Sequence, residues 1–223
     1  MSLRAIAGAG AVLAGLLLGP AAQAAPAVQL TGTQLASALL PPSSFPSGYK
    51  IVKSGTYNSG RSLEHAPAKF RLATFSCKRY ILNGLPRTGF GETATAGSIV
   101  NKVGLGAYQQ TVFQFASSGQ AASFYRQLYA FTVRCRSVTA PFGGGTAKLT
   151  TQSLKKTHLG RLPAFRAVQT LTATGLPATV NDTTATVTGT DVYVIDAAGR
   201  KAPSKPAVAT ALLHLIARVQ AAR

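Results

Sequence analysis

The sequence predicts an α+β fold in which helices pack on an antiparallel β-sheet, and two observations carry this prediction. The second half of the chain is rich in threonine and valine, and glycine and proline turns divide it into short alternating segments, as in antiparallel strands. Two other segments, residues 118–133 and 206–219, repeat apolar residues at helical spacing instead. Runs of strands with one central and one terminal helix are typical of the α+β class.

The first residues have the pattern of a cleavable signal peptide. Arg4 supplies the positive charge, residues 5–19 are apolar, and Ala22-Gln23-Ala24 matches the small-x-small pattern of a cleavage site. The apolar run of about 15 residues is shorter than the roughly 20 that a membrane span needs. We therefore predict a signal peptide over residues 1–24, a flexible leader over 25–32, a single domain over 33–223, and no transmembrane segment after cleavage.

The chain is strongly basic, with 23 Lys and Arg against 5 Asp and Glu and a net charge of +18. Loss of residues 1–24 removes only Arg4, so the mature chain keeps a charge of +17. This excess attracts polyanions. For an exported protein the expected anions are teichoic acids, phospholipid headgroups, polyphosphate or acidic sugars, and nucleic acid is not expected as a physiological partner. The alternative is a composition that only keeps the protein soluble.

The two cysteines, Cys77 and Cys135, agree with export. They form an even pair, without CxxC spacing and without histidines at metal-ligand offsets. In an oxidising compartment the simplest outcome is one disulfide between them. A catalytic thiol would leave the other cysteine unexplained.

The first half of the mature chain predicts short elements. A helix is expected from Gln34 to Leu40, with Thr33 as its N-cap and Pro41-Pro42 at its end. Residues 45–49 read as a turn that presents Phe45 and Tyr49. The remaining expectations are a strand at 49–57, a loop at 58–68, and a strand or short helix at 70–80.

The rest of the chain predicts more regular elements. Residues 108–115 alternate, with Phe113 and Phe115 on one face and Gln110 and Gln114 on the other. A helix over residues 118–133 follows, capped by Ser117 or Ser118, and leads directly into Cys135. Further strands are expected at 92–103, 136–140, 146–153, 164–172, 185–190 and 191–196, and Pro206 opens the last helix.

No catalytic constellation stands out. Glycan hydrolysis needs two carboxylates at a fixed separation, and none of the five, Glu64, Glu92, Asp182, Asp191 and Asp196, has a distinctive setting. The histidines form no HExxH motif, GxSxG is absent, and the glycines near Lys148 lack the ending of a P-loop. We therefore expect no enzyme activity, no metal and no cofactor.

The layout resembles the extracellular PknH-like sensor domains of actinobacteria. The resemblance is carried by Leu35-Ala36-Ser37-Ala38-Leu39-Leu40-Pro41, the turn Ser44-Phe45-Pro46-Ser47-Gly48-Tyr49, the first cysteine, the central helix with Phe124-Tyr125 and Leu128 before Cys135, and the closing amphipathic helix. It implies an antiparallel sheet with helices enclosing a ligand-binding cleft, without catalysis. The kinase sensor domains typically have two disulfides and a membrane anchor, whereas this sequence has one cysteine pair and predicts no anchor.

The leading hypothesis is a secreted, non-catalytic binding or sensor-like domain that captures an extracellular or cell-wall ligand, with an anion as the expected class. Its candidate ligand-binding residues follow the central helix: Arg134, Arg136, Lys155, Lys156 and Arg161. A solvated charged face is the ordinary alternative for these residues. Two other hypotheses are a surface interaction module that docks through Phe45 and Tyr49, and an envelope hydrolase that uses Glu64 or Glu92.

Overall fold

The computed structural model describes residues 28–60, 63, 67–200 and 205–223. The predicted signal peptide lies outside the described residues, as do Glu64 and His65. None of the helices in the described part is long and apolar enough to cross a membrane.

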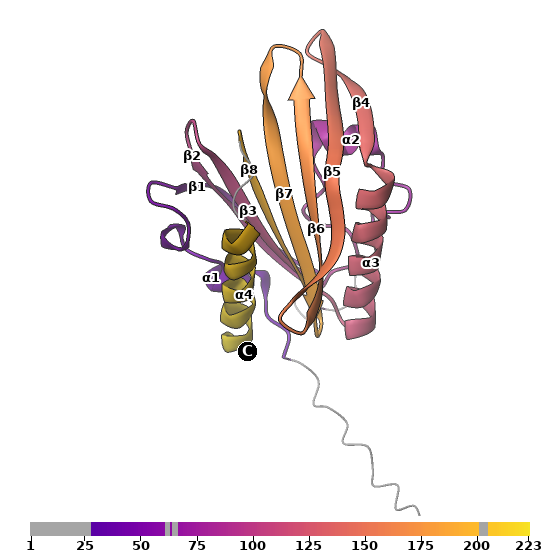
Figure 1. The fold of residues 1–223 in the computed structure, drawn as a ribbon. Helices are drawn as coiled ribbons and strands as arrows, with labels where there is room; N and C mark the ends of the chain where they lie inside the picture. Colours follow the sequence, from indigo (N-terminus) through magenta and orange to yellow (C-terminus); the bar gives the residue numbers. More distant parts are fainter. Residues whose placement is uncertain (1–27, 61–62, 64–66, 201–204) are drawn as a thin grey trace, which may run out of the picture.

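The described part of the chain forms one antiparallel sheet of eight strands, in the order β1-β2-β3-β8-β7-β6-β5-β4 (Figure 1). The predicted α+β class is thus confirmed. The strands are β1 (Lys50–Asn58), β2 (Ala94–Lys102), β3 (Gly106–Gln114), β4 (Ser137–Phe142), β5 (Gly145–Leu159), β6 (Leu162–Ala173), β7 (Leu176–Thr188) and β8 (Asp191–Gly199).

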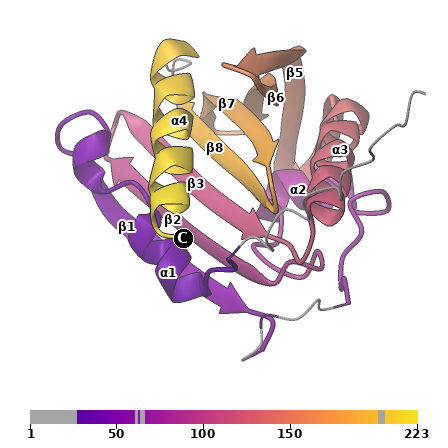
Figure 2. The same ribbon diagram turned by 90° about the horizontal axis from the view of Figure 1, so that it is seen from below.

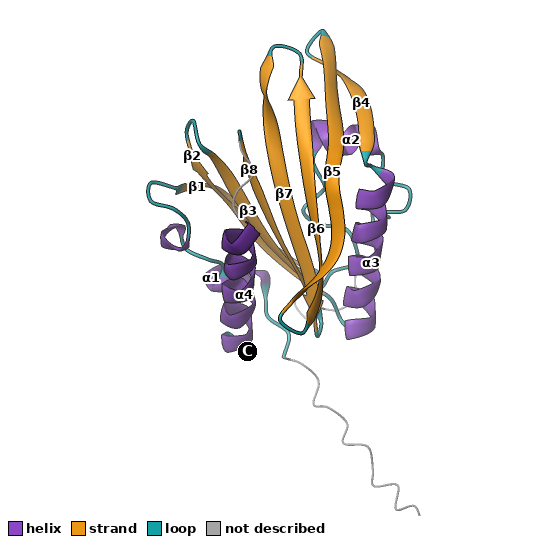
Figure 3. Ribbon diagram, viewed as in Figure 1, coloured by secondary structure: helices purple, strands orange, loops and turns teal. Residues whose placement is uncertain are grey.

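In the described residues, four α-helices flank this sheet, and the two long ones, α4 and α3, lie on its opposite sides (Figure 2). We call the two sides the α4 face and the α3 face. The β4–β5 and β6–β7 hairpins rise above the helices at one end of the sheet (Figure 3). The helices are α1 (Gly32–Ala38), α2 (Cys77–Asn83), α3 (Ser118–Arg134) and α4 (Lys205–Ala221), with a 3-10 turn at Pro42–Ser44.

Strand alternation divides the core into two clusters, because successive residues point to opposite faces of a sheet. On β8, Tyr193 and Ile195 pack with α1 and α4, whereas Val192 and Val194 pack with the aromatic side chains of α3. Burying apolar area on both faces at about 25 cal/mol per Å² is the main driving force that holds the helices to the sheet.

The first helix begins earlier than predicted. Thr31, not Thr33, is the N-cap: its hydroxyl accepts from the Gln34 N–H at 3.2 Å, while the Gln34 side chain accepts from the Thr31 N–H at 2.8 Å. This reciprocal capping box satisfies two helix donors at once. Leu30 is already buried, so ordered packing starts within the predicted leader.

Two buried glutamines on β3 hold the N-terminal segment against the α4 face. Gln114 donates to the Leu30 carbonyl and accepts from the Leu30 N–H, each at 2.8 Å. Gln110 exchanges the same pair of bonds with Leu40. Gln110 and Gln114 lie on the face opposite Phe113, as predicted. That face is also buried, because the N-terminal segment covers the two glutamines.

The predicted disulfide joins Cys77, at the start of α2, to Cys135, at the end of α3, with a Cα–Cα distance of 5.4 Å. The segment before α2 is held to the same helix end, because the Arg134 guanidinium donates to the carbonyls of Leu72, Ala73 and Phe75. Of the region expected as a strand or short helix at 70–80, residues 70–76 form a loop, and the short helix is confirmed from Cys77 onward as the start of α2.

Two strands are longer than predicted. β5 continues to Leu159 rather than ending near Ser153, and it has a bulge between Thr151 and Ser153. β7 begins at Leu176 rather than at Ala185. Charged and amide side chains interrupt both extensions, Lys155 and Lys156 on β5 and Asn181 and Asp182 on β7, so little apolar alternation signals a strand there.

Candidate functional site

All four side-chain carboxylates in the described part of the chain face inward and are hydrogen-bonded. Glu92, Asp182 and Asp191 are each at most 1% exposed. Glu92 accepts from two backbone N–H groups, those of Gly89 at 2.6 Å and Phe90 at 2.7 Å. Asp191 accepts from the Tyr193 hydroxyl at 2.8 Å and from Arg223 at 2.6 Å.

The other two carboxylates lie on β7 and β8. Asp182 forms an ion pair with Arg166 on the α4 face, with Nε at 2.8 Å from Oδ1. Asp196 accepts a bond of 2.5 Å from the Thr183 hydroxyl on the α3 face. Desolvation by burial and, to a smaller extent, the negative charge of Asp182 raise the pKa of Asp196 to about 6, although the hydrogen bond from Thr183 lowers it. Burial likewise raises the pKa of Glu92 and of Asp191.

These contacts give Glu92 a structural role. Its two oxygens are both occupied by the turn at Gly89 and Phe90, so the carboxylate does not point at a substrate site. Within the described ranges, no three His, Cys, Asp or Glu side chains are grouped as metal ligands. The hydrolase hypothesis therefore gains no support from Glu92.

The structure brings two of the five predicted cations together. Arg136 lies just before β4, and Lys155 lies on β5 beyond the bulge. Together they line a polar notch of about 300 Å³, whose remaining walls are the segment Thr151–Leu154. The Thr151 N–H donates to the Arg136 carbonyl at 2.7 Å and closes one end of this notch. Both cationic side chains are exposed.

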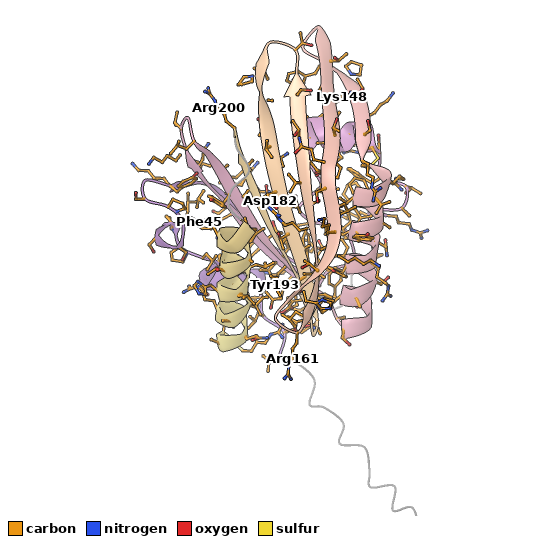
Figure 4. All side chains as sticks on the ribbon, viewed as in Figure 1. Phe45, Lys148, Arg161, Asp182, Tyr193 and Arg200 are labelled. Atoms are coloured by element: carbon orange, nitrogen blue, oxygen red, sulfur yellow. A yellow bond between two sulfur atoms is a disulfide. The ribbon has the colours of Figure 1, made fainter. Side chains whose placement is uncertain are left out.

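The other three predicted cations have separate positions. Arg134 is occupied by the loop carbonyls before α2 and serves the fold. Lys156 points to the α3 face, with its Nζ 5.1 Å from the centre of the Tyr129 ring. Arg161 lies in the β5–β6 turn, at the opposite end of β5 from Lys148 (Figure 4).

Sequence reasoning missed Arg166, which is the register partner of Lys155 on the α4 face. Arg166 and its partner Asp182 are separated by 16 residues in the sequence, and no local pattern links them. Only the β6–β7 pairing brings the two side chains together. Asp182 neutralises Arg166 in place, whereas its register partner Lys155 is exposed.

The aromatic turn is not presented to solvent as predicted. Phe45 is 7% exposed and its ring centre lies 5.0 Å from that of Tyr108, while the Tyr49 ring lies 5.3 Å from the same side chain. Both aromatics thus belong to the core on the α4 face. Phe45 is therefore not available as a docking residue, and Tyr49 is only partly exposed.

A second hollow of about 240 Å³ lies between α3 and the loops before β2. Its floor consists of phenyl rings, with Phe90 and Phe124 at 5.3 Å and Phe115 and Phe124 at 5.1 Å between ring centres. Arg71 is the one cation in its lining. This hollow suits an apolar group, whereas the notch beside β5 suits an anion.

Comparisons with known proteins place the fold. No family model matches the chain, and no curated protein matches it in sequence. The extracellular domain of PknH from Mycobacterium tuberculosis is similar in structure, with a TM-score of 0.59 and 16% identity over 85% of this chain and 96% of that one. A putative uncharacterized protein from Mycobacterium smegmatis matches with a TM-score of 0.41 and 10% identity, covering 84% of this chain and 95% of the other. The first likeness shows that this chain shares the fold of the PknH extracellular domain.

Proposed function

We propose that this protein is a non-catalytic binding domain that acts outside the cytoplasm and captures an anionic ligand of the cell envelope. One observation carries the proposal: every described side-chain carboxylate is at least partly buried and hydrogen-bonded, while most of the described Lys and Arg side chains are exposed. A surface of this kind has few negative groups to offset its positive field, which raises the local concentration of anions.

Location outside the cytoplasm is supported by two independent features. The N-terminal sequence has the pattern of a signal peptide. The Cys77–Cys135 disulfide is the bond expected in an oxidising compartment. The fold shared with the extracellular domain of a mycobacterial protein agrees with both. Signalling to a partner is not part of the proposal.

Within the cationic surface, we propose the notch lined by Arg136 and Lys155 as the contact point for an anionic group. These two side chains come from the residue before β4 and from β5, and the bulge at Thr151 and Ser153 lies between them. A phosphate or carboxylate oxygen in this space can accept charge-assisted bonds from both cations, which are stronger than neutral hydrogen bonds.

The double substitution Arg136→Glu with Lys155→Glu is expected to weaken binding to immobilised polyphosphate by about tenfold or more, equivalent to about 1.4 kcal/mol. Reversing these charges removes two donors and adds repulsion at the contact point. Binding is measured by surface plasmon resonance at about 0.1 M salt, where exposed charges still act over about 10 Å.

The matched control is Lys50→Glu with Lys53→Glu, on the exposed strand β1 at the other edge of the sheet. This variant has the same net charge as the first, and we expect it to change affinity less. Equal losses in both variants would mean that the overall charge binds the polyanion and that the notch has no special role.

A further inference from the structure

Among the described strands, none pairs with the outer edge of β5 beyond Thr151. We propose that this edge binds an acidic, extended peptide segment of a partner protein by β-strand addition. The inference rests on the proposed function, since it names the class of anion that the notch at Arg136 and Lys155 takes.

The length difference between the two outermost strands creates the site. β5 runs over 15 residues, from Gly145 to Leu159, whereas β4 pairs only with its first part, Gly145 to Thr150. One further bond joins Thr151 to Arg136. From Gln152 onward, the strands in the described ranges pair with β5 only on its β6 side.

The register of the β5–β6 hairpin identifies the backbone N–H and C=O groups of β5 that point away from β6. The β5–β6 loop has two residues, so Leu159 and Leu162, which flank it, form a hydrogen-bonded pair. Alternation along an antiparallel ladder then turns the N–H and C=O groups of Leu154, Lys156 and His158 away from β6. The same counting from the two-residue β4–β5 loop turns Thr151 toward β4, which its bond to Arg136 confirms.

Side chains along this edge are exposed at Lys155, Lys156 and His158. The notch of about 300 Å³ occupies the upper end of the edge, directly in line with β4. α3 lies on one side of the sheet and does not continue the row of strands (Figure 2). Lys156 reaches back over Tyr129 of α3, so the helix provides a wall along the α3 face of the proposed slot.

The positive charges beside the β5 edge favour an acidic peptide as its partner. Arg136, Lys155, Lys156 and Arg161 lie along the slot from one end to the other, and a strand in it would place alternate side chains beside Lys155 and Lys156 on the two faces. Glutamate or aspartate at those positions is therefore favoured. A second copy of this chain is disfavoured, because pairing of two β5 edges would bring lysines together, and edge lysines are a known protection against self-association.

The free backbone groups favour a peptide over other anions. A polyphosphate or acidic sugar has no row of N–H and C=O groups to pair with Leu154, Lys156 and His158, whereas an extended peptide does. The opposite edge, β1, is less suited, since α1 packs against it and a bulge at Ile51 and Lys53 interrupts its register.

The test uses the purified protein and a capped peptide of about eight residues, a common strand length, that alternates glutamate with threonine or valine. A second peptide has the same sequence but is N-methylated at two consecutive central residues, so each edge loses a donor while the charge is unchanged. We expect the first peptide to slow amide exchange at Leu154, Lys156 and His158, and the second to bind about tenfold more weakly. We also expect Lys155→Glu with Lys156→Glu to weaken the first peptide more than Lys50→Glu with Lys53→Glu does.

Each other outcome has a distinct meaning. Equal binding of both peptides would overturn strand addition and leave only electrostatic capture, as the proposed function requires. Absence of peptide binding beside retained polyphosphate binding would overturn the inference alone. Failure to bind either the peptide or polyphosphate would overturn both proposals. Protection at β1 in place of β5 would also contradict the site.

Discussion

Breaking the Cys77–Cys135 disulfide is expected to lower the free energy of unfolding by about 4 kcal/mol. The bond closes a loop with a sequence separation of 58 residues, and the chain-entropy model assigns this magnitude to a loop of that size. The bond also joins α2 to the end of α3, two helices on the α3 face. The free energy is measured by urea unfolding of the Cys77→Ala with Cys135→Ala variant against the oxidised protein.

The wild-type protein with its disulfide reduced is the matched control, because it has no substituted side chain and leaves no cavity at the buried Cys135. Both forms should unfold at a lower urea concentration than the oxidised protein. A reduced protein that unfolds within about 1 kcal/mol of the oxidised one would contradict a structural role for the bond.

The second large effect is on the pH dependence of stability. The pKa of Asp196 in the folded protein is raised to about 6, from an ordinary value of 3.8. Between these values the folded state holds a proton that the unfolded state releases, so the stability contributed by the protonated carboxyl falls as pH rises through the folded pKa. The loss is complete above about pH 7 and amounts to at most about 3 kcal/mol.

The variant Asp196→Asn isolates this effect, because its amide oxygen can still accept from Thr183 but does not ionise. Thermal melts of both proteins are compared from about pH 4 to pH 8, the window that the folded and unfolded pKa values define. The melting temperature of the wild type should fall relative to that of the variant as pH rises. Parallel curves over this window would show that Asp196 titrates normally.

The sequence predicted the features that have a clear signal in the sequence itself, such as apolar residues at helical spacing or a single pair of cysteines. The helix after Ser117 has four buried apolar residues at helical spacing, Ala121, Phe124, Leu128 and Phe131, and α3 matches its predicted range within one residue. The pairing of Cys77 with Cys135 followed from count and compartment alone. These two signals can be read without knowing how distant strands pair.

Other features depend on pairing between distant segments. Thr33 and Thr31 are equally good N-caps by residue type, and the buried bonds of Leu30 and Leu40 to β3 glutamines decide the start of α1. Phe45 and Tyr49 read as exposed turn residues until Tyr108 is placed beneath them. Aromatic side chains in a turn have no local signal that separates burial from exposure.

The candidate site was predictable only in part for the same reason. Arg136 and Lys155 were named for their charge, but the strand register and the bulge bring them to one notch and separate them from Arg134 and Arg161. The free edge of β5 depends on where β4 begins, which the disulfide-linked end of α3 determines. Arg166 is adjacent to Lys155, yet its pairing with Asp182 needs the β6–β7 register.

The most direct test of the central claim is the salt dependence of polyphosphate binding by the wild-type protein. The account predicts strong retention at about 0.05 M salt and loss of at least tenfold in affinity by about 0.5 M, because screening weakens interactions between exposed charges. Protein that is not retained at low salt, with intact folding by circular dichroism, would contradict an anion-binding role for its cationic surface.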